Sequence, residues 1–176
     1  NNDKSKLLGL TASPERRTGD QKDQLGLAFD AIIDCADIEE LIKENVLVPA
    51  IYKPFFVHDF DHHDLDISTG DFPVEQLANA IIKSSMIEYA CRIYLSERKQ
   101  IKEKVISAWF CPDIVVAEKT LEAVESLNLS VELITAKTPL KKRLEILSNH
   151  ESGKLECLIS VGVLSEGWDN PNCNII

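Results

Sequence analysis

Short apolar runs alternate with amphipathic runs through the second half of the chain, and this alternation limits the possible folds more than any other feature. The expected strands are Val105–Phe110, Val131–Thr135, Leu155–Val161 and the start of another at Cys173–Ile176, and the expected helices between them are Asp113–Leu127 and Pro139–Asn149. Alternation of this kind is typical of βαβ units with a parallel sheet. The sequence therefore predicts an α/β fold in which a parallel sheet is flanked by helices and ligands bind at the carboxyl ends of the strands.

The first half of the chain has a less regular pattern. Asp37 suits the N-cap of a helix that ends near Asn45, because Glu40 stands at the capping-box position. Pro73 suits the first turn of one long helix that reaches toward Tyr94. Shorter elements are expected as a strand at Leu7–Ala12, a helix at Gln24–Phe29, a strand at Ala31–Cys35 and a β-rich run at Val46–Tyr52.

The composition is that of a globular protein. Hydrophobic residues make up 44% of the chain and charged residues 27%, so a buried core is expected. No apolar run approaches the roughly 20 residues that a membrane-spanning helix needs, and the first residues are not a secretory signal. The five cysteines show no CxxC or metal-ligand spacing. This pattern favours a reducing compartment, so we expect a cytoplasmic protein with no membrane partner.

The net charge of -10 bears on possible partners. A protein that coats nucleic acid would carry a basic surface, so this charge argues against that class. It does not argue against a motor that holds a few phosphates through local amides and hydroxyls.

An acidic segment between residues 58 and 66 contains three histidines and four aspartates. Those side chains could supply nitrogen and oxygen ligands to a metal. Adjacent histidines in a loop do not preorganise such a site, however, and no distant Cys or His is evident as a partner. We expect a solvated linker with no metal.

Polar groups follow apolar runs in several short segments that carry a family resemblance. Leu8–Pro14 reads LGLTASP and Leu164–Pro171 reads LSEGWDNP. Between them stand Gly70–Phe72, Trp109–Cys111, and Thr135–Pro139 followed by Arg143. In this order and spacing the segments resemble the motor of superfamily 2 (DEAD/DEAH-type) helicases, in particular the branch of DNA-repair helicases and type III restriction-enzyme motors. The first segment resembles motif III, usually LGLTATP, and the second resembles motif V, usually LTEGFDxP.

The resemblance implies roles at the nucleotide. Thr11 and Ser13 would present hydroxyls to the catalytic carboxylates of a first RecA-like domain and relay the nucleotide state. Gly167 would allow close approach of the backbone, and Asp169 would accept hydrogen bonds from the ribose hydroxyls of ATP. Either segment could instead be an ordinary strand exit or surface turn.

The resemblance also implies contacts to nucleic acid. Ser165 would hold a backbone phosphate, and so would Thr138 and Arg143 at the start of a helix. For Arg143 an exposed salt bridge is the competing interpretation. Trp168 is expected to pack rather than to stack on a base.

Several motor parts of the family do not occur in this sequence. There is no GxGKT phosphate loop, no DExH carboxylate pair and no QxxGRxxR motif. We therefore expect a fragment that does not hydrolyse ATP by itself and that needs the first RecA-like domain of the same polypeptide. The expected divisions are 1–48 as the C-terminal part of the first RecA-like domain, 49–72 as a linker, and 73–176 as the second RecA-like domain.

The main functional hypothesis is an ATP-dependent helicase or translocase that uses ATP with Mg²⁺ and acts on DNA in preference to RNA. A second hypothesis is a non-catalytic RecA-like module for interaction or regulation, which the acidic charge would suit. A third is the motor subunit of a restriction enzyme. The neighbouring coding sequence would distinguish them, because only a motor needs the phosphate loop and the carboxylate pair. A nuclease domain after the motor would favour the restriction enzyme.

Overall fold

The computed structural model describes residues 6–10, 29–31, 33, 36–61, 63, 65–66, 72–164 and 168–176. The chain divides into two compact units, Asn1–Pro54 and Phe55–Ile176. Residues 24–28 of the predicted helix over residues 24–29 and most of the predicted strand over residues 31–35 lie outside the described residues.

In the first unit, α1 (Ile38–Lys43) begins where the sequence predicts. The side chain of Asp37 accepts a hydrogen bond from the backbone N–H of Glu40 at 2.7 Å, which confirms the expected N-cap. The described part of the predicted first strand, residues 7–10, and the β-rich run over residues 46–52 form no strand, and both are exposed. A strand is stable only when a neighbouring strand satisfies its backbone groups, and among the described residues none pairs with these segments.

The second unit contains the predicted parallel sheet. Its strands are β1 (Ser107–Phe110), β2 (Val131–Ile134) and β3 (Cys157–Ser160), in the order β1-β3-β2. Both pairings are parallel, which confirms the predicted α/β class. The expected fourth strand is reduced to a single parallel bridge between Ile175 and Ser107.

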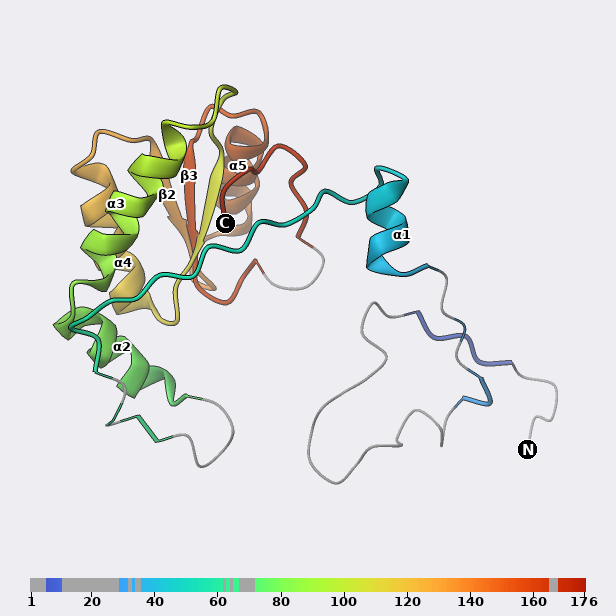
Figure 1. Cartoon of the computed structure of the whole chain (residues 1–176), viewed down its shortest axis with the longest axis horizontal. Helices are drawn as coiled ribbons and strands as arrows, with labels where there is room; N and C mark the ends of the chain where they lie inside the picture. The colour runs from blue at the N-terminus through green and yellow to red at the C-terminus, as the bar shows by residue number, and fades with distance from the viewer. Residues whose placement is uncertain are drawn as a thin grey trace. The chain divides into compact units, whose positions relative to one another are not determined.

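Helices cover both faces of this sheet. α3 (Met86–Arg98) and α4 (Ile114–Glu125) lie on one side of the strands, and α5 (Leu140–Glu151) lies on the other (Figure 1). α4 begins at Asp113, whose side chain accepts from Val116 N at 2.8 Å. α5 begins after Pro139 and ends before Gly153, whose positive φ of 69° suits glycine.

The single long helix expected from Pro73 to Tyr94 is wrong. Instead α2 (Val74–Lys83) and α3 are separate helices, divided at Ser84 and Ser85. The backbone of Ser84 is extended, and its hydroxyl donates to the carbonyl of Ile81 at 2.9 Å. Serine hydroxyls compete with helix hydrogen bonds in this way.

The start of α3 is held by the segment that the sequence predicts to be a linker. The carboxylate of Asp59 accepts from the Ser85 backbone N–H and from the Ser85 hydroxyl, both at 2.9 Å. Residues 55–61 contain no helix or strand, as expected for a loop, yet this loop is attached to the second unit.

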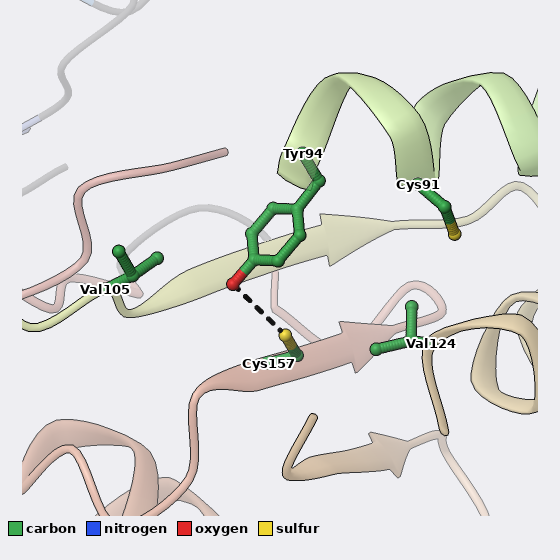
Figure 2. Close-up of a cluster of buried hydrophobic side chains, with 5 residues drawn as sticks. All are labelled: Cys91, Tyr94, Val105, Val124 and Cys157. Carbon is green, nitrogen blue, oxygen red and sulfur yellow. Dashed lines mark hydrogen bonds between the residues drawn. The ribbon is translucent and has the colours of Figure 1, made fainter. Parts of the chain in front are cut away.

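The core is packed on both sides of β3. Cys157 points toward α3 and α4, where it joins Cys91, Tyr94, Val105 and Val124 (Figure 2). The next residue, Leu158, belongs to a second cluster with Ile134 of β2 and Ile146 of α5. Successive residues of a strand face opposite sides of the sheet, so β3 is buried on both faces, as expected for a central parallel strand. Within the part of the chain that the structure describes, no helix is long and apolar enough to span a bilayer.

Candidate functional site

The carboxyl ends of the three strands finish level with one another. Phe110 of β1 and Ile134 of β2 are each in register with Ser160 of β3. The backbone N–H of Cys111 donates to Ser160 O at 3.0 Å, and that of Val161 donates to Ile134 O at 3.2 Å, so the three chains leave the sheet together. Ligands of open α/β sheets bind at this edge. The loops that follow the strands therefore form the candidate site.

The loop after β2 contains Thr138 and is braced by Arg143. Thr138 Oγ1 accepts from the backbone N–H of Thr135 at 3.0 Å, and the Thr138 backbone N–H donates back to Thr135 O at 3.0 Å. One guanidinium nitrogen of Arg143 donates to Thr135 O at 3.1 Å and to Thr138 O at 3.5 Å. The structure thus brings these two predicted residues together in one turn, at the N-terminal end of α5.

The environment of Arg143 differs from that of an exposed salt-bridge partner. Its side chain is half-buried, it bonds to carbonyl oxygens, and its Nε is buried without a hydrogen-bond partner among the described residues. The exposed charged residues near it in the sequence are Lys137, Lys141, Lys142 and Glu145, and Lys142 pairs with Glu132 at 3.3 Å. The turn therefore carries positive charge on a chain whose net charge is negative, which suits an anionic ligand.

The loop after β3 is bent back onto its own strand. Ser160 Oγ accepts from the backbone N–H of Leu164 at 3.2 Å, and Gly162 has a positive φ of 63°. The next three residues include the predicted Ser165 and Gly167, which lie outside the described residues, as do Thr11 and Ser13.

Asp169 is described and exposed, between two neighbours that are fixed. Trp168 packs against the cluster around α5. The centroid of its ring lies 6.3 Å from the ring centroid of Phe110 and 6.1 Å from that of His150. Trp168 is therefore a packing residue, as predicted. Asn170 is buried, and its Nδ2 lies 3.1 Å from His150 Nδ1. The Asp169 carboxylate makes no hydrogen bond or ion pair with the described residues, so it is open to a ligand.

No motif in the sequence marks His150. It stands in the last turn of α5 with 1% of its surface exposed. Its Nε2 lies 3.0 Å from the carbonyl oxygen of Ser107, at the start of β1. Burial lowers the pKa of the imidazole, while the bond to Ser107 O opposes that change. The only signal in the sequence is that His150 falls four residues after Ile146 on the buried face of α5.

The described groups at this edge are the exposed carboxylate of Asp169 and the basic turn after β2. An exposed carboxylate can accept from ribose hydroxyls, and a basic turn can hold a phosphodiester. Among the residues that the structure places, no group of three His, Cys, Asp or Glu side chains could hold a metal ion. In the acidic segment, His62 and Asp64 lie outside the described residues.

Comparison with known proteins identifies one family and several relatives. The sequence pattern of the family "Helicase conserved C-terminal domain" matches residues 85–176. The chain is 26% identical over 180 residues to "Putative helicase 22" of Sulfolobus islandicus filamentous virus, and 24% identical over 170 residues to "Putative ATP-dependent helicase IRC3" of Saccharomyces cerevisiae. It is also 24% identical over 169 residues to a "51.5 kDa protein" of Lactococcus phage isolate 7-9.

These relatives are much longer than the chain. The alignments cover 96%, 97% and 96% of this chain but only 31%, 24% and 35% of the viral, yeast and phage proteins. Among solved structures, the crystal structure of the Pyrococcus furiosus Hef helicase domain aligns with 56% of this chain and 21% of that chain, at a TM-score of 0.46 and 17% identity.

Proposed function

The chain belongs to the family of helicase conserved C-terminal domains, and we propose that it works as the second RecA-like domain of an ATP-dependent motor that moves along or unwinds nucleic acid. The observation that carries the proposal is the family match over residues 85–176, which includes all three strands and the loops at their carboxyl ends.

In this proposal the loop after β3 contacts ATP. Asp169 accepts from the ribose hydroxyls, and Gly167 lets the backbone approach the nucleotide. The carboxylate of Asp169 is exposed and stands between two anchored residues, which supports this role. The phosphate loop and the carboxylates that hold Mg²⁺ would come from the first RecA-like domain, where Thr11 and Ser13 would report the nucleotide state.

The turn after β2 contacts the nucleic-acid backbone. Thr138 and Arg143 already shape this turn through hydrogen bonds, so the backbone amides at the start of α5 are held in a fixed arrangement. The neighbouring lysines favour a phosphodiester. Ser165 would add a hydroxyl contact. The preference for DNA over RNA rests on the resemblance to DNA-repair helicases.

The test uses the full-length gene product and measures ATP hydrolysis with and without single-stranded DNA. Asp169→Ala is expected to lower kcat/KM for ATP by about 10-fold or more, the size of a lost hydrogen bond to a charged acceptor. Glu118→Ala is the matched control, because Glu118 is an exposed carboxylate on α4, outside these loops. It should hydrolyse ATP at the unaltered rate.

Two results would contradict the proposal. DNA-stimulated hydrolysis that Asp169→Ala leaves unchanged would remove Asp169 from the nucleotide site. A full-length protein without any ATP hydrolysis would favour the non-catalytic RecA-like module instead. The same assay with single-stranded RNA in place of DNA shows which nucleic acid stimulates ATP hydrolysis more.

A further inference from the structure

Both neighbours of Asp169 contact the same buried side chain. The ring centroids of Trp168 and His150 lie 6.1 Å apart, and Asn170 Nδ2 lies 3.1 Å from His150 Nδ1. His150 and Asn170 are 1% and 8% exposed, whereas Asp169 between the two contacts is exposed. An exposed carboxylate thus stands on a segment whose two sides are fixed by one histidine.

The hydrogen bonds around His150 specify the state of its ring. Asn170 Oδ1 accepts from the backbone N–H of Asn172 at 3.0 Å, so the amide NH₂ of Asn170 faces His150 and must donate to Nδ1. A carbonyl can only accept, so Nε2 must carry a hydrogen and donate to Ser107 O. Both bonds are made only by the neutral ring with its hydrogen on Nε2.

The end of α5 keeps His150 in place. The backbone N–H of Gly153 donates to His150 O at 3.0 Å, and that of Leu155 donates to Asn149 O at 3.0 Å. Gly153 reaches this position with a positive φ, just after α5 ends at Glu151. The histidine is therefore fixed to the helix end on one side and to β1 on the other, and it can act as a rigid anchor for a third segment.

We infer that His150 is a positioning residue for Asp169, holding the segment of residues 168–172 so that the carboxylate is presented to the nucleotide. This inference rests on the proposed contact between Asp169 and ATP. His150 itself touches no substrate in this scheme. It fixes the residues beside Asp169 before the nucleotide arrives. Nucleotide binding then costs less conformational entropy in this segment.

Two variants separate the two hydrogen bonds of the ring. An asparagine at position 150 can place an oxygen near the position of Nδ1, so His150→Asn keeps the acceptor for Asn170 and loses the donor to Ser107 O. A glutamine can place an amide NH₂ near the position of Nε2, so His150→Gln keeps the donor and loses the acceptor. Both variants lose the aromatic ring, so packing alone predicts the same effect for both.

Hydrogen–deuterium exchange of the full-length protein measures the order of the segment. The amides of Asn172 and Cys173 are bonded to Asn170, and they report on it directly. Exchange in peptides over residues 168–173 should be about 2- to 10-fold faster in His150→Gln, the factor that one hydrogen bond of ordinary strength implies. His150→Asn should stay within about 2-fold of the unaltered protein in these peptides. Equal acceleration in both variants, or none in either, would overturn the positioning role.

The KM for ATP supplies a second readout. It should rise in His150→Gln by roughly the same 2- to 10-fold and stay near normal in His150→Asn. An unchanged KM in His150→Gln, despite faster exchange, would overturn the link between the anchor and the nucleotide. Failure of the proposed function appears separately, as unaltered hydrolysis by Asp169→Ala, because the exchange experiment does not depend on ATP.

Discussion

His150 Nδ1 and Asn170 Nδ2 lie 3.1 Å apart, and through this contact the last turn of α5 is bonded to the segment that carries Asp169. The bond requires a lone pair on Nδ1. A proton added there would face the NH₂ of Asn170, and turning the Asn170 amide round would place that NH₂ against the Asn172 N–H instead. The neutral ring is therefore the form that this structure stabilises.

The stability of the protein should depend on pH through His150. Burial lowers the pKa of this histidine below its ordinary value of 6.5, partly offset by the bond to Ser107 O. As the pH falls below about 6.5, the unfolded chain takes up a proton that the folded chain does not, so the free energy of unfolding decreases. That decrease should continue until the pH reaches the folded-state pKa. Urea denaturation at pH 7 and pH 5.5 measures it.

The matched comparison is His150→Gln, which lacks the titrating group. The free energy of unfolding of the unaltered protein should fall more between the two pH values than that of the variant. β1 and β3, which pack beside His150, carry no charged side chain, and Cys157 is their one titratable group. The nearby Glu151 and Asp169 are exposed. Parallel pH profiles for the two proteins would contradict the assignment of a neutral His150.

Two glycines with nearly the same φ angle should respond differently to substitution. Gly153 has φ 69° and Gly162 has φ 63°, so alanine is strained at both. At Gly153 an added Cβ would also lie 3.1 Å from Lys104 Cδ and 3.3 Å from Ile106 Cδ1, whereas no atom of the described residues lies within 4 Å of a Cβ added at Gly162. Gly162→Ala should lower the free energy of unfolding by about 1 kcal/mol and Gly153→Ala by about 2 kcal/mol. Equal losses in thermal or urea denaturation would show that the packed neighbours move aside.

The hydroxyl of Tyr94 should stabilise the sheet through an acidic partner. It donates to Glu156 Oε1 at 2.7 Å, and Arg98 Nε donates to the same oxygen at 2.6 Å. Burial opposes the charged form of Glu156, but the bonds from Arg98 and Tyr94 outweigh it and lower the pKa of the carboxyl. Tyr94→Phe should therefore lower the free energy of unfolding by about 1–2 kcal/mol.

Tyr89→Phe provides the control for this change, because Tyr89 lies on the same helix and its hydroxyl makes no hydrogen bond with the described residues. It should change the free energy of unfolding by less than about 0.5 kcal/mol. If Tyr94→Phe and Tyr89→Phe have the same free energy of unfolding, the Tyr94 hydroxyl does not stabilise the fold.

Local patterns account for what the sequence could predict. The β strands and the helices α4 and α5 follow from apolar periodicity and from capping residues such as Asp113, because these signals act within a few residues. The break at Ser84 was not predictable in the same way. Serines also occur inside helices, and the Asp59 carboxylate that accepts from the Ser85 hydroxyl at the start of α3 lies 26 residues away in the sequence.

In the candidate site, too, residues with a local sequence signal were predictable and residues that depend on long-range contacts were not. Thr138 and Arg143 were predicted from a motif, and the structure places them in one turn. His150 was missed because its partners are Ser107 and Asn170, 43 and 20 residues away in the sequence. A buried histidine on a helix has no local signature that tells a packing role from an anchoring one. The proposed anchoring role follows only from the way α5, β1 and residues 168–172 meet at His150.

The reactivity of two cysteines should report on the anchored segment. Cys157 is fully buried in β3, and burial raises the pKa of its thiol. Cys173 is half-buried, its backbone N–H donates to Asn170 O at 2.9 Å, and burial raises its pKa as well. Thiols react as thiolates, so both should label slowly in the folded protein. Cys157 should react only through global unfolding, whereas Cys173 should react after a local opening of the segment.

His150→Gln should therefore accelerate the alkylation of Cys173 relative to that of Cys157. Loss of the bond to Asn170 loosens the segment that holds Cys173, and the acceleration should be about 2- to 10-fold beyond any change at Cys157. Labelling with iodoacetamide at pH 8, followed by mass spectrometry of the two peptides, measures both rates in one sample. Since Cys157 reacts only on global unfolding, its rate corrects for a general loss of stability. Equal acceleration at both thiols would mean that His150 stabilises the whole domain and does not order the residues around Asp169 in particular.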